Sequence, residues 1–381
     1  MTRPSYDLAV VGAGIVGLAH ALAAARLGKR VVVIDRDAQA NGASIRNFGF
    51  VTVTGQERGT VWRRARRSRD VWDEVGRAAG IPIEHRGLAM VARRPEALAV
   101  LDAFMKTEMA EGCRLLGPSA ARERLPMLAA DGIAGALWSE IDLRVESREA
   151  IPRLAVFLAE RYGVTFLRDT LVRAVEPPRI ETSAGLVEAE ACVVCPGDDF
   201  LTLFPERIAS YGVTKCKLHM MRLAAPGWTL PAAIMSDLGL VRYLGYAVLP
   251  EAAALKAQLE AEQADALAHG VHLIVVQSRD GSLVVGDSHH YGATPPPFAP
   301  EGVDAVILDE YRAVFRDPPP PAVERWTGIY ASAPDRTMFV DRPSAAVRIA
   351  VVTSGTGAST AFAIGEEVVT DLFGSTSPGA A

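Results

Sequence analysis

Apolar and polar residues alternate in two different patterns along the chain, and the change of pattern predicts two kinds of sheet. Near the N-terminus, apolar runs at 6–11 and 31–34 flank a helical pattern, which gives the order strand, helix, strand of a parallel α/β unit. The closing stretch 347–374 again reads as a strand, a glycine-rich turn and a helix. Amphipathic helices are predicted at 59–79 and 148–163, where apolar residues recur every three to four positions.

From residue 215 to residue 326 the pattern is that of an antiparallel sheet. Asp280 and Gly281 form a predicted hairpin turn between two apolar runs. One long polar helix is predicted at 251–270. The predicted strands are 215–223, 240–249, 271–280 and 281–292.

The first α/β unit contains a glycine turn with the spacing of a dinucleotide-binding site. Gly12, Gly14 and Gly17 follow the first strand in the pattern G-x-G-x-x-G. We expect Gly12 to permit a tight turn, Gly14 to let the backbone approach a pyrophosphate, and Gly17 to let the helix lie close to the strand. Asp35 ends the second strand, where a carboxylate accepts hydrogen bonds from a ribose. Together these features predict a site for an adenine dinucleotide.

Composition limits the class of protein and the kind of partner. Of the 381 residues, 49% are hydrophobic, which is enough for a large core and for two domains of a soluble globular protein. The net charge of −5 argues against nucleic acid as a partner, and nothing in the sequence indicates secretion or a membrane span. The arginine-rich stretch 57–72 fits the solvated face of an amphipathic helix. We therefore expect a cytoplasmic location.

The four cysteines do not predict a disulfide scaffold in a chain of this length. Cys192 and Cys195 form a C-x-x-C pattern at the end of a predicted strand. Side chains three residues apart on a strand point to opposite faces, so a redox or metal pair is not expected there. The histidines and carboxylates show no convincing ligand spacing, and no metal site is predicted.

Four stretches together resemble a known family: GAGIVG with Asp35, the loop GASIRNFG at 42–49, VVCPG at 193–197 and SGTGASTAF at 354–362. Along nearly its whole length the chain is similar to the glycine oxidase, sarcosine oxidase and D-amino-acid oxidase group of flavoenzymes. The motifs GASIRNFG, KCKLHMMR and GDSHHYG resemble those of a narrower branch of flavin oxidoreductases, which is associated with degradation of aminoethylphosphonate and its N-alkyl derivatives.

The resemblance implies a glutathione-reductase-like fold of the D-amino-acid oxidase type, within the α/β class. A Rossmann-like FAD-binding domain is expected in residues 1–85, 140–214 and 326–381. A substrate-binding domain with an antiparallel sheet is expected in residues 86–139 and 215–325. Substrate would lie between the two domains.

The resemblance also implies how FAD is held. Asp35 would bind the adenosine ribose, the backbone around Val172 would flank the adenine, and the N–H groups of the last glycine turn would meet the pyrimidine edge of the flavin. Gly328 stands in the place of the cysteine that binds flavin covalently in monomeric sarcosine oxidase, so the FAD is expected to be non-covalent. The expected FAD-binding residues are Gly12, Gly14, Ile15, Val16, Gly17, Asp35, Arg36, Ala43, Ser44, Arg46, Asn47, Phe48, Gly49, Val172, Gly197, Gly355, Thr356, Gly357, Ala358 and Ser359.

The implied reaction moves a hydride from an amine-bearing carbon to flavin N5, and water then hydrolyses the imine. The protein must place that carbon, keep the nitrogen unprotonated and bind the anion of the substrate, and no dedicated acid–base side chain is strictly needed. Relatives of the sarcosine oxidase kind carry a lysine that helps oxygen react, and Val284 stands at the comparable place here. The electron acceptor is therefore left open between O2 and another acceptor.

An anionic substrate calls for arginine, lysine, histidine or hydroxyl donors. The expected catalytic residues are Arg46, Arg242, Tyr243, His289 and Tyr330. By resemblance, Tyr330 stands where relatives place a tyrosine or an arginine that engages the acid group of the substrate. Arg46 could equally anchor an FAD phosphate or pair with a neighbouring carboxylate. Only one of Arg242 and Tyr243 can face the flavin if both lie on one strand.

Three further residues stay open as substrate contacts. His290 is adjacent to His289 and is the less favoured of the two histidines. Lys215 and Lys217 share one face of a predicted strand, and that face points either at the ligand or at solvent.

We expect an FAD-dependent oxidoreductase that oxidises the C–N bond of a small anionic primary or secondary amine, with an N-alkylated 2-aminoethylphosphonate as the preferred substrate. A glycine- or sarcosine-type amino-acid oxidase is the alternative within the same class. A tRNA-modifying flavoprotein is disfavoured by the acidic charge balance. A non-catalytic or NAD-binding protein is disfavoured by the loop 42–49 and the turn 354–362, which an NAD domain does not need. The oligomeric state is left open.

Overall fold

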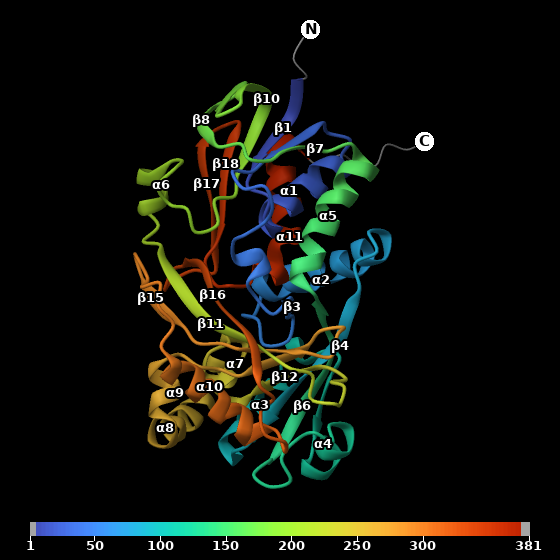
Figure 1. Cartoon of the computed structure of the whole chain (residues 1–381), viewed down its shortest axis with the longest axis vertical. Coiled ribbons are helices and arrows are strands. Elements are labelled where there is room, and N and C mark those ends of the chain that lie inside the picture. The colour runs from blue at the N-terminus through green and yellow to red at the C-terminus, as the bar shows by residue number, and fades with distance from the viewer. Residues whose placement is uncertain (1–4, 375–381) are drawn as a thin grey trace.

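The computed structural model describes residues 5–374 and builds them into two large sheets, one above the other in Figure 1. The upper sheet has the strand order β17-β18-β10-β1-β2-β7, and the hairpin of β8 and β9 joins it at β10. The strands from β18 to β7 are parallel, as the α/β pattern predicts, and β17 is antiparallel. Their bounds are β1 (Ser5–Val11), β2 (Val31–Ile34), β7 (Thr165–Leu167), β8 (Val172–Glu176), β9 (Arg179–Thr182), β10 (Gly185–Val194), β17 (Met338–Ser344) and β18 (Val347–Val352).

The lower sheet has the order β15-β11-β14-β13-β12-β4-β6-β3, with β16 added at β11 and β5 at β6. All its pairs are antiparallel except that of β4 with β12, so the sheet is mixed and the purely antiparallel sheet predicted from the sequence is wrong at this one pair. The bounds are β3 (Phe50–Val51), β4 (Ile83–Ala92), β5 (Cys113–Leu116), β6 (Gly135–Val145), β11 (Thr214–Leu223), β12 (Ala233–Ser236), β13 (Ile274–Gln277), β14 (Leu283–Gly286), β15 (His290–Gly292) and β16 (Ala322–Ser332).

Helices pack on one face of the upper sheet, where α1 lies against α11 and α11 lies against α2 (Figure 1). Cys195 belongs to the core under these helices and Cys192 to the core on the opposite face of the sheet, which confirms that the two thiols point apart. The bounds are α1 (Ile15–Arg26), α2 (Thr60–Ala78), α3 (Pro95–Phe104), α4 (Pro118–Arg124), α5 (Ser147–Tyr162), α6 (Pro205–Ala209), α7 (Leu244–Ala247), α8 (Ala252–Glu262), α9 (Ala264–Ala268), α10 (Glu301–Val314) and α11 (Gly357–Phe373), with 3₁₀ turns η1 (Ala43–Ile45), η2 (Glu108–Ala110) and η3 (Asp237–Val241).

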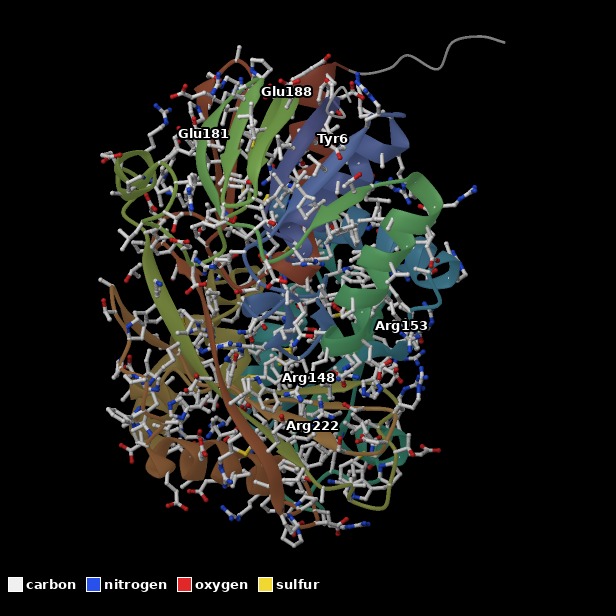
Figure 2. All side chains as sticks on the ribbon, turned by 45° about the horizontal axis from the view of Figure 1, so that its top comes forward. Tyr6, Arg148, Arg153, Glu181, Glu188 and Arg222 are labelled. Carbon is white, nitrogen blue, oxygen red and sulfur yellow. The ribbon has the colours of Figure 1, made fainter. Side chains whose placement is uncertain are left out.

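The arginines of α2 lie on its polar face, as the sequence predicts. Arg64 and Arg67 form ion pairs with acids of α11, Glu367 and Glu366, at 2.6 Å each. Charged side chains such as Arg153 line the outer side of α5 in the same way (Figure 2). Within residues 5–374, no helix combines the length and the apolar character needed to cross a membrane.

The segment 240–249 is not the strand that its apolar run predicts. It forms the end of η3, then the turn of α7, and Gly245 packs so closely on the loop after β3 that a Cβ would lie 2.5 Å from the carbonyl oxygen of Gln56. The predicted helix 251–270 is divided into α8 and α9 at Gln263, whose backbone leaves the helical region. Both corrections place short helices beside the lower sheet.

The division into two domains stays a proposal. Strands β4, β6, β11 and β16 of the lower sheet each run across one of the predicted boundaries, near residues 85, 139, 214 and 325. A boundary inside a hydrogen-bonded strand is unfavourable, so we place the domain limits at the ends of these strands.

Candidate active site

A cavity of about 940 Å³ lies where the ends of α1 and α11 meet β16 and the edge of the lower sheet. Most of the residues expected to bind FAD line it. They are Gly14, Ile15, Val16, Gly17, Ala43, Ser44, Arg46, Asn47, Phe48, Gly197, Gly355, Thr356, Gly357, Ala358 and Ser359.

The glycine turn before α1 packs as its sequence predicts. Gly12 has φ +100°, and a Cβ there would lie 2.4 Å from the carbonyl oxygen of Cys195. A Cβ at Gly17 would lie 1.9 Å from the carbonyl oxygen of Gly12, so only glycine lets α1 approach the turn. Ser44 Oγ accepts a hydrogen bond of 2.9 Å from the first N–H of α1, at Ile15. The loop 42–49 is thereby joined to the start of α1.

Five of the residues expected to bind FAD do not line this cavity: Gly12, Asp35, Arg36, Gly49 and Val172. The carboxylate of Asp35 accepts hydrogen bonds from the backbone N–H groups of Ala13, at 2.5 Å, and Asp37, at 2.9 Å. It therefore stabilises the glycine turn. Arg36 pairs with Asp199 at 2.7 Å. Contact of Asp35 with a ribose remains a prediction.

Gly49 and Val172 have evident packing roles. At Gly49, with φ +69°, a Cβ would lie 1.7 Å from the carbonyl oxygen of Val145, because the loop passes directly over the end of β6. The side chain of Val172 is buried in the core of the upper sheet.

The residues of the cavity fit FAD. Two helix N-termini, of α1 and α11, open into the same space, and such termini favour anionic or partly negative groups. The volume lies toward the upper end of the roughly 300–1,000 Å³ found for cofactor and ligand pockets. Gly355 has φ +72°, and a Cβ there would meet the ring of Tyr330 at 3.1 Å, so the turn before α11 is kept free of side chain. Gly328 also lines the cavity.

All five expected catalytic residues line the cavity, including both Arg242 and Tyr243. The expectation that only one of this pair faces inward is wrong, because the two residues lie at a helical turn and not on a strand. Arg242 donates a hydrogen bond of 2.8 Å to the hydroxyl of Tyr291, which also lines the cavity. Burial opposes the charge of Arg242, but Tyr291 and Tyr330 raise its pKa above the ordinary value. The guanidinium therefore stays charged.

The three residues left open from the sequence do not line the cavity. Lys215 pairs with Asp198 at 3.3 Å, and the Lys217 ammonium donates to two backbone carbonyls at 2.6 and 2.8 Å. His290 packs beside the rings of His219 and His269. Val284, expected near the flavin, is buried in the core of the lower sheet, whereas Asp287 and His289, farther along the same segment, line the cavity.

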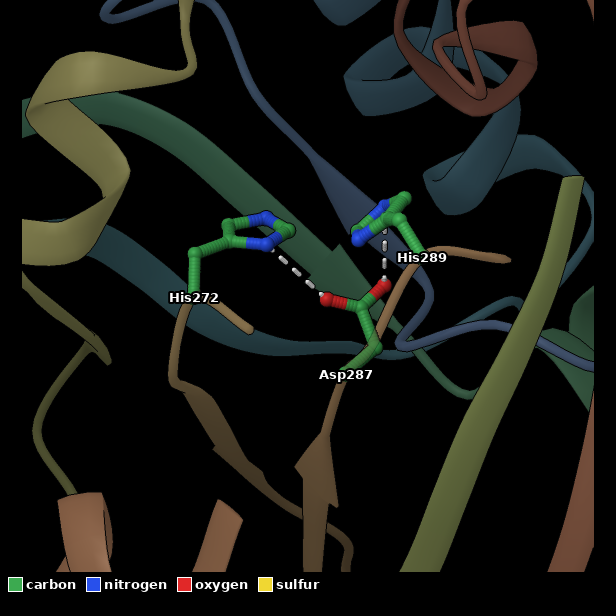
Figure 3. A group of neighbouring side chains, drawn as sticks. All are labelled: His272, Asp287 and His289. Atoms are coloured by element: carbon green, nitrogen blue, oxygen red, sulfur yellow. Dashed lines mark ion pairs between the residues drawn. The ribbon is translucent and has the colours of Figure 1, made fainter. Parts of the chain in front are cut away.

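His272 and Asp287 also line the cavity, although no sequence pattern predicted them as site residues (Figure 3). They lie at facing ends of β13 and β14, and His289 lies two residues beyond Asp287. Asp287 Oδ1 is 3.2 Å from His272 Nδ1, and Asp287 Oδ2 is 3.7 Å from His289 Nε2. All three side chains are buried. The β13–β14 hairpin thus places a carboxylate between two imidazoles.

Ligand-type atoms of these three residues lie within 4.8 Å of one another, a spacing that a metal ion can use, whereas the sequence predicted no metal site. The charge of Arg242 acts on all three groups: it lowers the pKa values of Asp287, His272 and His289. The positive charge of Arg242 opposes a divalent metal ion at this cluster. We therefore interpret the cluster as a site of hydrogen bonding and proton exchange.

Burial shifts the charges of this cluster toward neutrality. It raises the pKa of Asp287 to about 8, although Arg242 acts in the opposite direction. Burial and Arg242 together lower the pKa values of His272 and His289 well below their usual range. At neutral pH the cluster consists of two neutral imidazoles and a carboxyl group that holds a proton.

This shift predicts a dependence of stability on pH. The folded-state pKa of Asp287 lies above its value of 3.8 in an unfolded chain, so its contribution to stability is complete below about pH 4 and is lost as the pH rises toward 8. The loss reaches about 1.4 kcal/mol per pH unit within that window. In Asp287→Asn the group does not titrate. Thermal unfolding between pH 5 and pH 9 should show the Tm of the wild type falling relative to that of the variant, and parallel curves would contradict the shift.

Comparisons with known proteins show which family and which solved structures this chain is similar to. A model of the family described as "DAO: FAD dependent oxidoreductase" matches residues 7–371. Among solved structures, a glycine oxidase from Bacillus cereus ATCC 14579 superposes with a TM-score of 0.77 at 18% identity, covering 97% of this chain and 95% of that one. No curated protein matches the sequence.

Two other solved structures show the same fold. An L-proline dehydrogenase from P. horikoshii has a TM-score of 0.75 at 18% identity and covers 97% of this chain and 94% of its own. An iminodiacetate oxidase from Chelativorans sp. BNC1 has a TM-score of 0.73 at 18% identity, with coverages of 98% and 97%. The family model spans nearly all of the described residues, and the cavity fits its cofactor. The chain therefore belongs to the DAO family of FAD-dependent oxidoreductases and has the α/β fold of that family.

Proposed function

We propose that this oxidoreductase oxidises the C–N bond of a small anionic primary or secondary amine. One observation carries the proposal: the cavity that fits FAD also contains a charged arginine, Arg242, surrounded by the tyrosines at 243, 291 and 330. Bound FAD would supply the hydride acceptor for this oxidation, and water would hydrolyse the resulting imine. The protein supplies the position of the amine carbon and the binding of the anion.

In this proposal Arg242 binds the anionic group of the substrate, and the hydroxyls of Tyr330 and Tyr243 donate further hydrogen bonds to that group. Arg46 donates a hydrogen bond of 2.9 Å to Asn41 and lines the cavity within the loop 42–49, so we assign it to FAD. We place His289 beside the amine group of the substrate. The solved glycine oxidase and iminodiacetate oxidase share only the fold at this identity, yet both proteins are named for amine-bearing substrates.

The preferred substrate is an N-alkylated 2-aminoethylphosphonate. A phosphonate presents three oxygens, and the guanidinium and the phenols of this cavity supply several donors for them. A glycine- or sarcosine-type amino acid, with a carboxylate, is the alternative. We further propose a cytoplasmic enzyme with no nucleic acid partner, and either O2 or another compound as the electron acceptor.

Product analysis tests the substrate. With N-methyl-2-aminoethylphosphonate and a dye as electron acceptor, ³¹P NMR should show a new phosphonate species at a rate far above that of conversion of sarcosine, assayed in parallel. Equal or faster conversion of sarcosine would favour the amino-acid oxidase, and conversion of neither would contradict amine oxidation.

FAD should be released intact when the protein is denatured. Gly328 offers no thiol at the cavity, and burial raises the pKa of the Cys195 thiol, the one cysteine among residues 5–374 that lines it. Precipitation with trichloroacetic acid should leave all the yellow colour in the supernatant. A yellow pellet, or a fluorescent protein band on a denaturing gel, would show a covalent link.

A further inference from the structure

The cavity contains a buried carboxyl group to which the proposed function assigns no role. Three acids within the described chain line the cavity: Glu57, Asp287 and Asp335. Glu57 and Asp335 are exposed, and Asp335 pairs with Arg336 at 2.6 Å. Asp287 is 4% exposed, and its Oδ1 has no hydrogen-bond partner that satisfies the usual angles. A buried carboxyl oxygen with an unfilled acceptor position suits an N–H donor of a ligand.

Hydrogen bonding fixes the protonation of the neighbouring imidazole. His289 Nδ1 lies 2.9 Å from the carbonyl oxygen of Gly270, which can only accept, so Nδ1 carries the ring proton. In the neutral ring Nε2 then has a lone pair, and this atom faces Asp287 Oδ2 at 3.7 Å (Figure 3). Two lone pairs repel unless a proton lies between them. The arrangement therefore favours a proton on Asp287 that points at His289.

The other charged and titratable groups around Asp287 come from four elements. His272 precedes β13, Arg242 and Tyr243 come from the turn between η3 and α7, Cys216 lies on β11 and Tyr330 on β16. Arg242 is the single permanent charge among them. It offers a place for an anion close to the carboxyl group, so the cavity has one pole for an anion and one for an ammonium group.

We propose that Asp287 is the base that removes the proton from the substrate's ammonium group, with His289 as the residue that orients its carboxyl group once the proton is on it. An N–H bond of the ammonium breaks and an O–H bond forms on Asp287, while the electron pair stays on nitrogen. The free pair then assists departure of hydride from the adjacent carbon. This inference rests on the proposed function and adds a proton acceptor to it.

The test is the pH profile of anaerobic flavin reduction by N-methyl-2-aminoethylphosphonate, followed in a stopped-flow instrument with the purified FAD-loaded enzyme. In the wild type, the limiting rate should rise with pH and level off above about pH 8. In Asp287→Asn, the rate at pH 8 should fall about 100-fold or more. It should also rise about tenfold per pH unit without levelling off, because only amine deprotonated by solvent can react.

Asp304→Asn is a matched control, because Asp304 forms another buried carboxylate–histidine pair, 3.3 Å from His219, away from the cavity. Its profile should be that of the wild type. The unfolding measurement described above gives a readout free of turnover: the titration of Asp287 must disappear in Asp287→Asn. If that variant does not hold FAD, Asp287→Glu decides, since a displaced plateau supports the base and an unchanged profile overturns it.

Two results would overturn the assignment. One is a limiting rate and pH profile of Asp287→Asn within about threefold of the wild type. The other is a stoichiometric metal ion in the purified enzyme, measured by mass spectrometry and lost in Asp287→Asn, because a metal-bound carboxylate cannot take the proton. Absence of flavin reduction in the wild type with this amine and with sarcosine is different, because it contradicts the proposed function itself.

Discussion

Replacing Gly17 by valine should abolish FAD binding. A Cβ at this position would lie 1.9 Å from the carbonyl oxygen of Gly12 and 3.2 Å from the side chain of Val10. Val10 lies in β1 and Gly12 in the turn that follows it, and neither backbone can give way, so α1 must move outward and its free N–H groups move away from the cofactor. Overpacking of this kind lowers the free energy of unfolding by about 1–3 kcal/mol or more. The purified variant should be colourless, as judged by the flavin absorbance per protein, and should unfold at a lower Tm.

Gly302→Ala serves as the control for this substitution. Gly302 is the second residue of α10, and a Cβ added there would meet no atom within 4 Å. Alanine also favours a helix over glycine by up to about 1 kcal/mol. This variant should bind FAD fully. A yellow Gly17→Val protein with wild-type Tm would contradict the packing at the start of α1.

Replacing Arg242 by methionine should weaken binding of the anionic substrate by about 100-fold. A hydrogen bond to a charged group contributes about 1.5–3 kcal/mol, and removal of one partner of a desolvated charge pair weakens binding by about 2–5 kcal/mol. Each 1.4 kcal/mol corresponds to about a factor of ten in the dissociation constant. The substrate concentration that gives half the maximal rate of anaerobic flavin reduction measures the effect.

Lys215→Met is the matched control, because it also removes one positive charge on the substrate side of the fold. Lys215 pairs with Asp198 and does not line the cavity, so its variant should bind the amine as the wild type does. An Arg242→Met enzyme with unchanged affinity, or equal losses in both variants, would refute Arg242 as the anion site.

Local sequence patterns predicted the parts of the fold that local chemistry determines. The turn at Gly12 and Gly17, the hairpin at Asp280-Gly281 and the polar face of α2 follow from backbone conformation and helical spacing, and the structure has all three. The strand predicted at 240–249 was wrong, because an apolar stretch of that length fits a strand or a buried helix equally well. Its conformation depends on the close contact of Gly245 with the loop after β3, which no local pattern reveals.

The sequence predicted those parts of the candidate site that contain a motif. It did not predict the parts that only the pairing of strands brings together. His272 belongs to no motif, and the motif GDSHHYG gives Asp287 no separate role, yet the predicted hairpin between them shows that the two residues meet. Its register pairs Ile274 with Gly286, so the residues just outside that pair must meet. Extending the register beyond the strands would have brought the histidine and the acid together. The roles of Asp35 and Gly49 depend on contacts with distant backbone and could not be read in that way.

Anaerobic titration of the purified yellow protein tests the central claim most directly, with N-methyl-2-aminoethylphosphonate and sarcosine added in separate experiments and the flavin absorbance followed. We predict complete bleaching of the flavin band by the phosphonate at concentrations that leave the band unchanged with sarcosine. Bleaching by sarcosine alone would contradict the phosphonate and indicate an amino-acid oxidase. A flavin that neither amine bleaches would contradict amine oxidation at this site.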